Sequence, residues 1–560
     1  MVLFLTTASL CSVFLVQDGV VVGEDIGGQV KSSLQWVKGQ VPYPNILLSP
    51  NPNDLSDNSM NWSLRPPGAA IIPVPGLLLG LSLGLSIKIA LFFFAVAGGS
   101  GWLYLLKRFG ICQHTLLLVS ILLGLMVGNY TSQFSSANII LFALVPWFLV
   151  WLSSLSNTIN IDAFKGKNLF KVGFFLFCIG SFCWVKLSGI IAAGTIGTTL
   201  LISILIKVRN KLKAALVFVL LGILFWVPFA GLEGLNHFLL GKTADQGYKQ
   251  FVTSSESPLT GEHWMASTQS SWLIWSLAAA PGYALPTKSI AIGIRDLGKQ
   301  FQSFREWMYE KEINDHVFLA GSLSLLLTLL LIFEIKSAFS MFNLYFKIMI
   351  LCFCTLPFIG LSILSNRFQW NYLMFHSHTF EYWLVFIVPT LTILSKSKYV
   401  SLRTLCLSGI LLAFPLWKNA QSLTSQFLSS NNSIISDTET ARGLTSSRFS
   451  QAINYIETDS DNNLDIIYFL PSGDMGDLVL RTKMRTMATH FSGGNFPQLS
   501  HFKTSKELNI YLAYDEKLSG IPEFTKAISD KFQNSILEKT ILKGGIFVQR
   551  IRMLQTPSLS

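Results

Sequence analysis

The chain has 560 residues, of which 51% are hydrophobic and only 13% are charged, whereas soluble domains carry about 25% charged residues. This composition excludes an ordinary soluble protein and indicates that much of the chain lies in lipid. The net charge of +11 does not indicate nucleic-acid binding, because the basic residues occur in short clusters between apolar runs, where positive-inside topology explains them.

About eleven apolar stretches approach the length of roughly 17 to 25 residues that crosses a bilayer. The first is expected to be a retained span, because it has no basic leading region and no small-residue cleavage site before Gln17. The stretches are 1–16, 84–106, 111–128, 137–155, 172–187, 188–206, 214–231, 316–334, 343–364, 380–395 and 402–417.

The basic residues of the short loops all fall on one side if the spans alternate, which makes that side cytoplasmic. The chain is thus predicted to sit in the plasma (inner) membrane with its N-terminus inside. The outer face then carries loops 17–70 and 232–315 of a core at 1–417, and a soluble domain at 418–560. These basic residues are Lys107, Arg108, Lys165, Lys167, Lys171, Lys207, Arg209, Lys211, Lys213, Lys336, Lys396, Lys398 and Arg403.

The C-terminal tail is predicted to be a small α/β domain. Helical periodicity at 447–456 is followed by strand-like runs at 465–470, 508–514 and 545–551. The predicted fold is therefore an all-α polytopic membrane bundle with a small C-terminal α/β soluble domain.

Two adjacent carboxylates, Glu24 and Asp25, lie in the first outer loop directly after an apolar stretch that ends at Val22. Carboxylates beside a membrane surface are suited to deprotonating an acceptor hydroxyl or amine, or to holding a divalent cation. A divalent cation is the one cofactor that the sequence suggests. The alternative is a solvated acidic turn without a chemical role.

Further along the same loop, Arg65 precedes Pro66, Pro67 and the next apolar run. The two prolines fix the backbone just before a helix begins, and they position Arg65 at headgroup depth, where a guanidinium can bind a phosphate. An ordinary interfacial arginine is the alternative.

Two further cations are candidate phosphate contacts. Lys186 lies between two apolar runs that form an outward-facing hairpin, so it is either an interfacial anchor or a contact for a lipid-borne phosphate. Arg367 is a candidate second phosphate ligand in a later outer loop.

Weaker candidates are polar residues near the later spans. His376, His378 and Glu381 stand at the mouth of a late span, within reach of a donor phosphate or a cation, although interfacial helix caps would look the same. His263 lies in an aromatic-rich loop that is suited to lying on the membrane surface.

The order of these parts resembles the GT-C superfamily of membrane glycosyltransferases, in particular the protein mannosyltransferase and aminoarabinose transferase branch. The matching order is a short apolar span, an acidic loop, an amphipathic segment at 33–39, a proline-rich stretch, a basic-Pro-Pro element and a long apolar run. The resemblance covers about the first 110 residues at the level of motifs, and the remainder only in layout.

The resemblance implies transfer of a sugar from a polyprenyl-phosphate carrier to a lipid, glycan or protein acceptor on the outer face. Asp25, or Glu24 beside it, matches the family's first-loop acidic residue and would act as general base or orient a metal. Arg65 matches the basic residue before the double proline, where the family usually has Lys, and would bind the carrier phosphate. The family's second acidic motif is missing from the short loop at 129–133.

Three alternatives stay open at this point. A transporter or flippase for lipid-linked saccharides would need charged residues at mid-span, and apart from Lys88, Lys347 and Lys186 the spans have few. A polymerase or ligase of surface polysaccharide would share the topology and the donor. A non-catalytic scaffold would use its tail to recruit partners.

Overall fold

The computed structural model describes the N-terminal half of the chain and much of the C-terminal tail, together with isolated positions between 344 and 444 and at 522 and 526. The described segments are 1–16, 19–22, 26–39, 46–47, 66–108, 113–134, 137–158, 167–186, 189–208, 210–240, 449–460, 465–470, 480–482, 484–488, 507–520 and 535–553.

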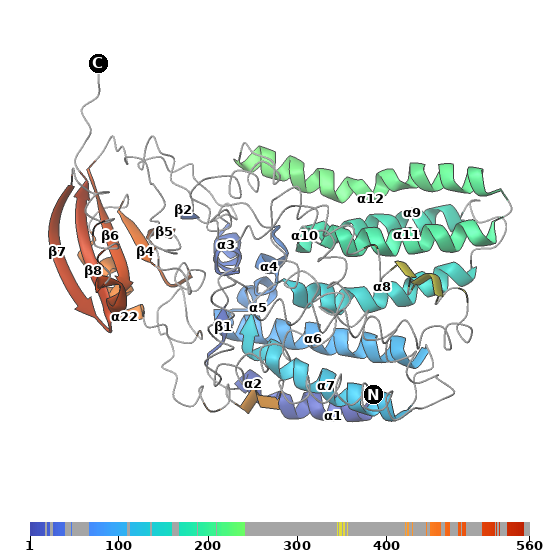
Figure 1. Ribbon diagram of the computed structural model, residues 1–560, viewed down its shortest axis with the longest axis horizontal. Helices are drawn as coiled ribbons and strands as arrows, with labels where there is room; N and C mark the ends of the chain where they lie inside the picture. Colours follow the sequence, from blue (N-terminus) through green and yellow to red (C-terminus); the bar gives the residue numbers. More distant parts are fainter. Residues whose placement is uncertain are drawn as a thin grey trace, which may run out of the picture.

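The N-terminal half is a bundle of long apolar helices (Figure 1). Five of its segments are long and apolar enough to cross a membrane, namely Leu83–Arg108, Asn138–Ser156, Lys167–Val185, Gly189–Lys207 and Lys211–Leu235. The helices are α1 (Val2–Cys11), α2 (Val13–Val16), α6 (Leu83–Arg108), α7 (Gln113–Ser132), α8 (Asn138–Thr158), α9 (Lys167–Gly180), α10 (Phe182–Val185), α11 (Gly189–Lys207) and α12 (Lys211–Leu240).

These helices coincide with the first seven apolar stretches expected from the sequence. The stretches expected at 316–334, 380–395 and 402–417 lie outside the described residues, and only scattered helical positions are described in 343–364. The protein is therefore an integral membrane protein of mainly helical structure, and a total of about eleven spans stays a prediction.

The bundle is held together by apolar packing and by indole hydrogen bonds that cross from one helix to another. α6 packs against α7 and α8, α1 packs against α7, and α9 packs against α12. The Trp102 indole on α6 is fully buried and donates to the Phe142 carbonyl of α8 at 3.2 Å. Trp147 on α8 donates to the Ala97 carbonyl of α6 at 3.0 Å. Both indole N–H groups are thereby satisfied where lipid offers no hydrogen-bond partner.

One end of the bundle gathers the basic residues. Lys107 and Arg108 end α6, Lys207 ends α11, and Lys211 begins α12. The Lys207 ammonium donates to the Ser156 carbonyl near the end of α8, which places the ends of α8 and α11 together. The opposite end of the bundle faces the C-terminal sheet (Figure 1).

That opposite end is covered by short elements of the segment between α2 and α6, most of which is the loop predicted to lie outside. β1 (Val21–Val22) pairs in parallel with β3 (Gln133–Phe134) between α7 and α8. α3 (Gly27–Val37) packs against α4 (Gly68–Ile71) and α5 (Val74–Leu78). A helix was expected to begin just after Pro66 and Pro67, and α4 begins there, whereas α5 was not expected. Both helices are too short to cross a bilayer, because prolines interrupt this apolar stretch.

The sheet beside the bundle is mixed and has the strand order β2-β5-β4-β6-β8-β7, and the described part of the tail supplies all of these strands except β2. The four strands from β2 to β6 are parallel, and β8 pairs antiparallel with both β6 and β7. The strands are β2 (Ile46–Leu47), β4 (Ile466–Leu470), β5 (Arg485–Ala488), β6 (Leu508–Asp515), β7 (Ser535–Lys543) and β8 (Ile546–Met553).

The expected tail helix and three strands correspond to α22 (Ser450–Asp459), β4, β6 and β8, whereas β5 and β7 were not anticipated. α22 contributes Ile453 and Ile456 to an apolar core beneath the sheet. The most unexpected strand is β2, because it comes from the first outer loop rather than from the tail. The division of the chain at 417 and 418 stays a prediction.

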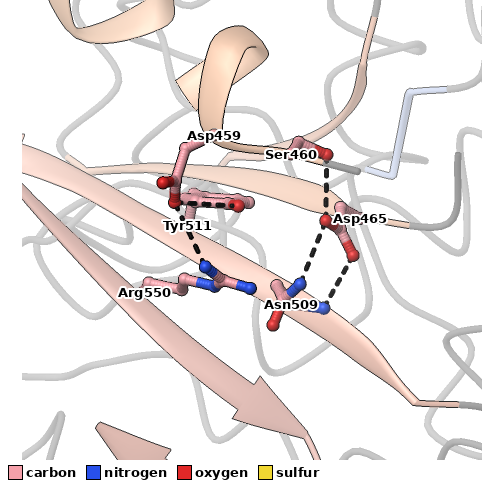
Figure 2. A network of polar contacts seen from close by, with 6 residues as sticks. All are labelled: Asp459, Ser460, Asp465, Asn509, Tyr511 and Arg550. Atoms are coloured by element: carbon pink, nitrogen blue, oxygen red, sulfur yellow. Dashed lines mark hydrogen bonds and ion pairs between the residues drawn. The ribbon is translucent and has the colours of Figure 1, made fainter. Parts of the chain in front are cut away.

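Carboxylates of the tail tie α22 and the segment after it to the sheet (Figure 2). Asp465 is buried and accepts hydrogen bonds from the Asn509 main-chain and side-chain nitrogens at 2.8 and 3.1 Å. Asp459, at the end of α22, accepts from the Tyr511 hydroxyl at 3.3 Å and from Arg550 at 3.4 Å. Burial raises the pKa of Tyr511, so its hydroxyl remains a donor. These contacts fix the helix on the sheet.

Candidate functional site

The acidic segment of the first outer loop is flanked on both sides by placed residues, although Glu24 and Asp25 themselves lie outside the described residues. On one side, Val22 in β1 is buried and pairs with Phe134 of β3. On the other side, Ile26 is 1% exposed, and its carbonyl accepts from the Val30 amide at 2.9 Å, which begins the first turn of α3. Four residues, 23–26, thus connect a short strand to a helix.

Lys186 lies at the same end of the bundle as the residues that flank this acidic segment. It follows the last residue of α10 in an extended conformation and is half-buried. Its ammonium donates to the Asn138 side-chain oxygen at 2.8 Å, across a sequence separation of 48 residues. Asn138 begins α8, four residues after Phe134 of β3. The strand that precedes the carboxylates and the amide that binds Lys186 are therefore parts of one local structure.

Arg65 also lies outside the described residues, but the residues that follow it are placed against the Lys186 hairpin. Pro66, Pro67 and Gly68 are buried. A Cβ added to Gly68 would lie 2.5 Å from the Val185 Cα and 2.8 Å from the Trp184 carbonyl oxygen. Only glycine permits α4 to approach α10 so closely. The residue before Lys186 is thus in direct contact with the third residue after Arg65.

The first outer loop folds back on itself so that its two ends meet. Ile26 and Val30 of the α3 region belong to the same buried apolar cluster as Ala69 and Ile72 of the α4 region. α3 and α4 also pack directly against each other, which brings these residues together. The residues on either side of the acidic segment, the two prolines that follow Arg65, and Lys186 therefore all border one end of the bundle.

The remaining candidates of the sequence analysis lie outside the described residues. They are Arg367, His263, His376, His378 and Glu381. Among the residues that the structure places, no three His, Cys, Asp or Glu side chains gather into a group that could hold a metal ion. Glu24 and Asp25, the carboxylates predicted to hold a divalent cation, lie outside the described residues.

Three residues near the site were not singled out for it by the sequence analysis. Asn138, the partner of Lys186, gives only a weak signal, because it is one polar residue at the start of an apolar stretch. Lys88 is 4% exposed in the second turn of α6, which places it near the loop-covered end rather than at mid-span. Lys31 of α3 donates to the Thr482 carbonyl in the C-terminal tail, and no pattern in the sequence around Lys31 predicts that contact.

Comparison with known proteins gives no sequence-level match. No protein-family model matches the chain, and no curated protein matches it. Among solved structures, the chain is similar to the oligosaccharyltransferase of Archaeoglobus fulgidus, crystallised with Zn and sulfate, with 13% identity and a TM-score of 0.41 over 92% of this chain and 68% of that one. It is also similar to apo ArnT from Cupriavidus metallidurans, with 11% identity and a TM-score of 0.39 over 98% of this chain and 97% of that one. At these TM-scores the similarity assigns no activity.

Proposed function

We propose that the protein is a GT-C-like membrane glycosyltransferase that moves a sugar from a polyprenyl-phosphate carrier to a lipid, glycan or protein acceptor on the outer face. In this proposal Asp25, or Glu24 beside it, activates the acceptor. Arg65 and Lys186 bind the carrier phosphate. The observation that carries the proposal is the contact between Gly68 and Val185, because it joins the segment after Arg65 to the residue before Lys186.

The chemistry requires these groups at one depth. A polyprenyl chain stays in hydrocarbon while its phosphate stays at the interface, so the enzyme has to present cations beside lipid. Displacement at the anomeric carbon needs one carboxylate to take the acceptor proton and positive charge to stabilise the departing phosphate. Since a chain advances at most about 3.6 Å per residue, Asp25 lies no more than about 11 Å from Val22.

The charge distribution supports the outer-face assignment. The basic helix ends gather at the end of the bundle away from the sheet, which is the end that the positive-inside rule assigns to the cytoplasm. The first outer loop and the C-terminal domain then lie outside. A transporter is less favoured, because Lys88 lies in the second turn of α6 and not at the middle of that helix.

The experiment compares Asp25→Asn and Glu24→Gln with the wild-type protein. Purified full-length protein in lipid nanodiscs is given a polyprenyl-phosphate-linked hexose, and transfer of labelled hexose to extracted membrane lipids, glycans and peptides is measured. We expect at least one of the two variants to lose a factor of about 10³ or more in kcat with an unchanged melting temperature, since removal of the general base typically costs 10²–10⁴.

The outcome also separates the alternatives. If both variants transfer sugar at the wild-type rate, the proposed function is wrong. If wild-type protein moves the intact lipid-linked saccharide across the membrane without forming a new glycosidic bond, a flippase takes its place. Formation of long polymers from the same donor would identify a polymerase.

A further inference from the structure

The first outer loop binds the C-terminal domain through Lys31, a half-buried lysine of α3. The Lys31 ammonium on α3 donates to the Thr482 main-chain carbonyl at 2.8 Å, across a separation of 451 residues. Thr482 is itself fully buried, and its hydroxyl donates to the Glu457 carboxylate of α22 at 2.7 Å. The Met484 amide donates to the same hydroxyl at 3.1 Å. Lys31 thus binds the carbonyl of a residue whose side chain is held by hydrogen bonds to α22 and to Met484.

A second contact joins the same loop to the same part of the domain. β2 adds to the edge of the sheet in parallel with β5, where Ile46 pairs with Thr486 and Leu47 with Met487. Lys31 and β2 therefore bind residues that lie only a few positions apart along β5 and the turn before it. In Figure 1, α3 and β2 lie between the helical bundle and the rest of the sheet. Two separate attachments restrain the loop more strongly than one flexible link would.

The chemistry of the Lys31 contact indicates that it does more than hold two surfaces together. The residue as a whole is half-buried, but its ammonium group is enclosed, and this burial lowers the pKa of Lys31 to about 8, with the Glu457 charge acting in the opposite direction. An enclosed ammonium is a costly way to join two surfaces, because an apolar side chain of similar size would join them without losing hydration. A directed hydrogen bond, by contrast, fixes one register between α3 and the domain.

The position of Lys31 connects this contact to the proposed chemistry. α3 begins at Gly27, two residues after Asp25, and Lys31 lies one helical turn further along. Ile26, which separates Asp25 from the helix, is fully packed in the core. A shift or rotation of α3 therefore displaces the end of the 23–25 segment to which it is joined.

We propose that the C-terminal domain positions the first outer loop for sugar transfer, with Lys31 as the positioning residue and β2 as the second attachment. This inference rests on the proposed function, because it assigns to the domain the placement of the carboxylates that the proposed function uses. It gives the domain a role in the transfer step that is independent of any acceptor bound by the domain itself.

The first test compares Lys31→Met with Lys31→Arg and with Lys38→Met in the full-length protein. Lys38 follows α3 and is exposed, so its variant is the matched control. We expect Lys31→Met to lower kcat by about 10- to 100-fold, because a misplacement of about 1 Å is enough for such a loss. The KM for the polyprenyl-phosphate-linked hexose should stay within about twofold. Lys31→Arg, which keeps a charged donor, should restore part of the rate, and Lys38→Met should behave as wild type.

The second test restores the attachment covalently. Paired positions on neighbouring strands lie about 4.8 Å apart, which is within the range that a disulfide bridges. We therefore add Ile46→Cys and Thr486→Cys to the Lys31→Met variant. Oxidation should recover at least half of the wild-type kcat, and reduction of the same sample should remove it again. Because both measurements use one preparation, a difference in folded fraction cannot produce this result.

Amide hydrogen exchange provides a readout that does not depend on activity. Amides of α3 should exchange at least tenfold faster in Lys31→Met than in wild type or Lys38→Met, since the helix loses its contact with the domain. The inference is overturned if exchange and kcat in Lys31→Met match wild type while the Asp25 and Glu24 variants are inactive. If the Asp25 and Glu24 variants both remain active, the proposed function fails, whatever Lys31 does.

Discussion

Gly68→Ala is the sharpest test of the contact on which the candidate site depends. The new Cβ would lie 2.5 Å from the Val185 Cα, 2.8 Å from the Trp184 carbonyl oxygen and 3.0 Å from the Val185 carbonyl oxygen. Non-bonded carbon atoms prefer separations of about 3.5–4.0 Å, so α4 and α10 have to move apart by about 1 Å. All three neighbours are backbone atoms, which cannot turn aside as a flexible side chain would.

The expected result is a loss of activity that exceeds the loss of stability. Overpacking of this kind costs about 1–3 kcal/mol of folding free energy. A shift of about 1 Å between the Arg65 segment and Lys186 should lower kcat/KM for sugar transfer by about 10²-fold. The assay is transfer of labelled hexose from a polyprenyl-phosphate carrier in nanodiscs, with the melting temperature measured on the same preparations.

The control is Gly194→Ala in α11, where an added Cβ would meet nothing within 4 Å. It should leave activity unchanged and stabilise its helix by roughly 0.5–1 kcal/mol, because alanine loses less backbone entropy than glycine. If Gly68→Ala keeps wild-type activity and stability, α4 and α10 do not meet as described, and the reasoning that brings Arg65 to Lys186 is refuted.

Two further predictions concern Lys186 and Lys31, which are both half-buried. Lys186→Met should lower kcat/KM by about 10²- to 10³-fold, because the proposed function gives the ammonium the carrier phosphate to bind. Asn138→Ala should lower it by only about tenfold, because Asn138 binds and orients the ammonium. Equal losses in the two variants would contradict these roles. The pKa of Lys31 is lowered from 10.5 to about 8 in the folded protein. Between pH 8 and pH 10.5 the unfolded chain therefore keeps a proton on Lys31 that the folded protein has released. The free energy of unfolding should rise with pH over this range. Wild type should gain about 1 kcal/mol over Lys31→Met between pH 7 and pH 9 in denaturant titrations, and a constant difference would show that Lys31 has an ordinary pKa.

The sequence by itself determined which parts of the described chain enter the membrane and which end of the bundle is basic. The helices of the bundle carry apolar side chains on nearly every face. Long apolar runs in the sequence therefore identify these helices without any knowledge of what they pack against. The periodicity of the tail likewise predicted α22, β4, β6 and β8. Lys186 was recognised as a candidate because one cation between two apolar runs stands out from its local surroundings.

Only the tertiary structure decided how these parts meet. The bond from Lys31 to Thr482, the bond from Lys186 to Asn138 and the pairing of β2 with β5 each join residues far apart in the chain. A two-residue strand has no periodicity to detect, and a lysine in a short amphipathic helix looks like an ordinary solvated residue. Local sequence reports the preference of a residue for water or lipid, whereas the choice of one polar partner depends on packing between distant segments, which fixes distances that no local pattern encodes.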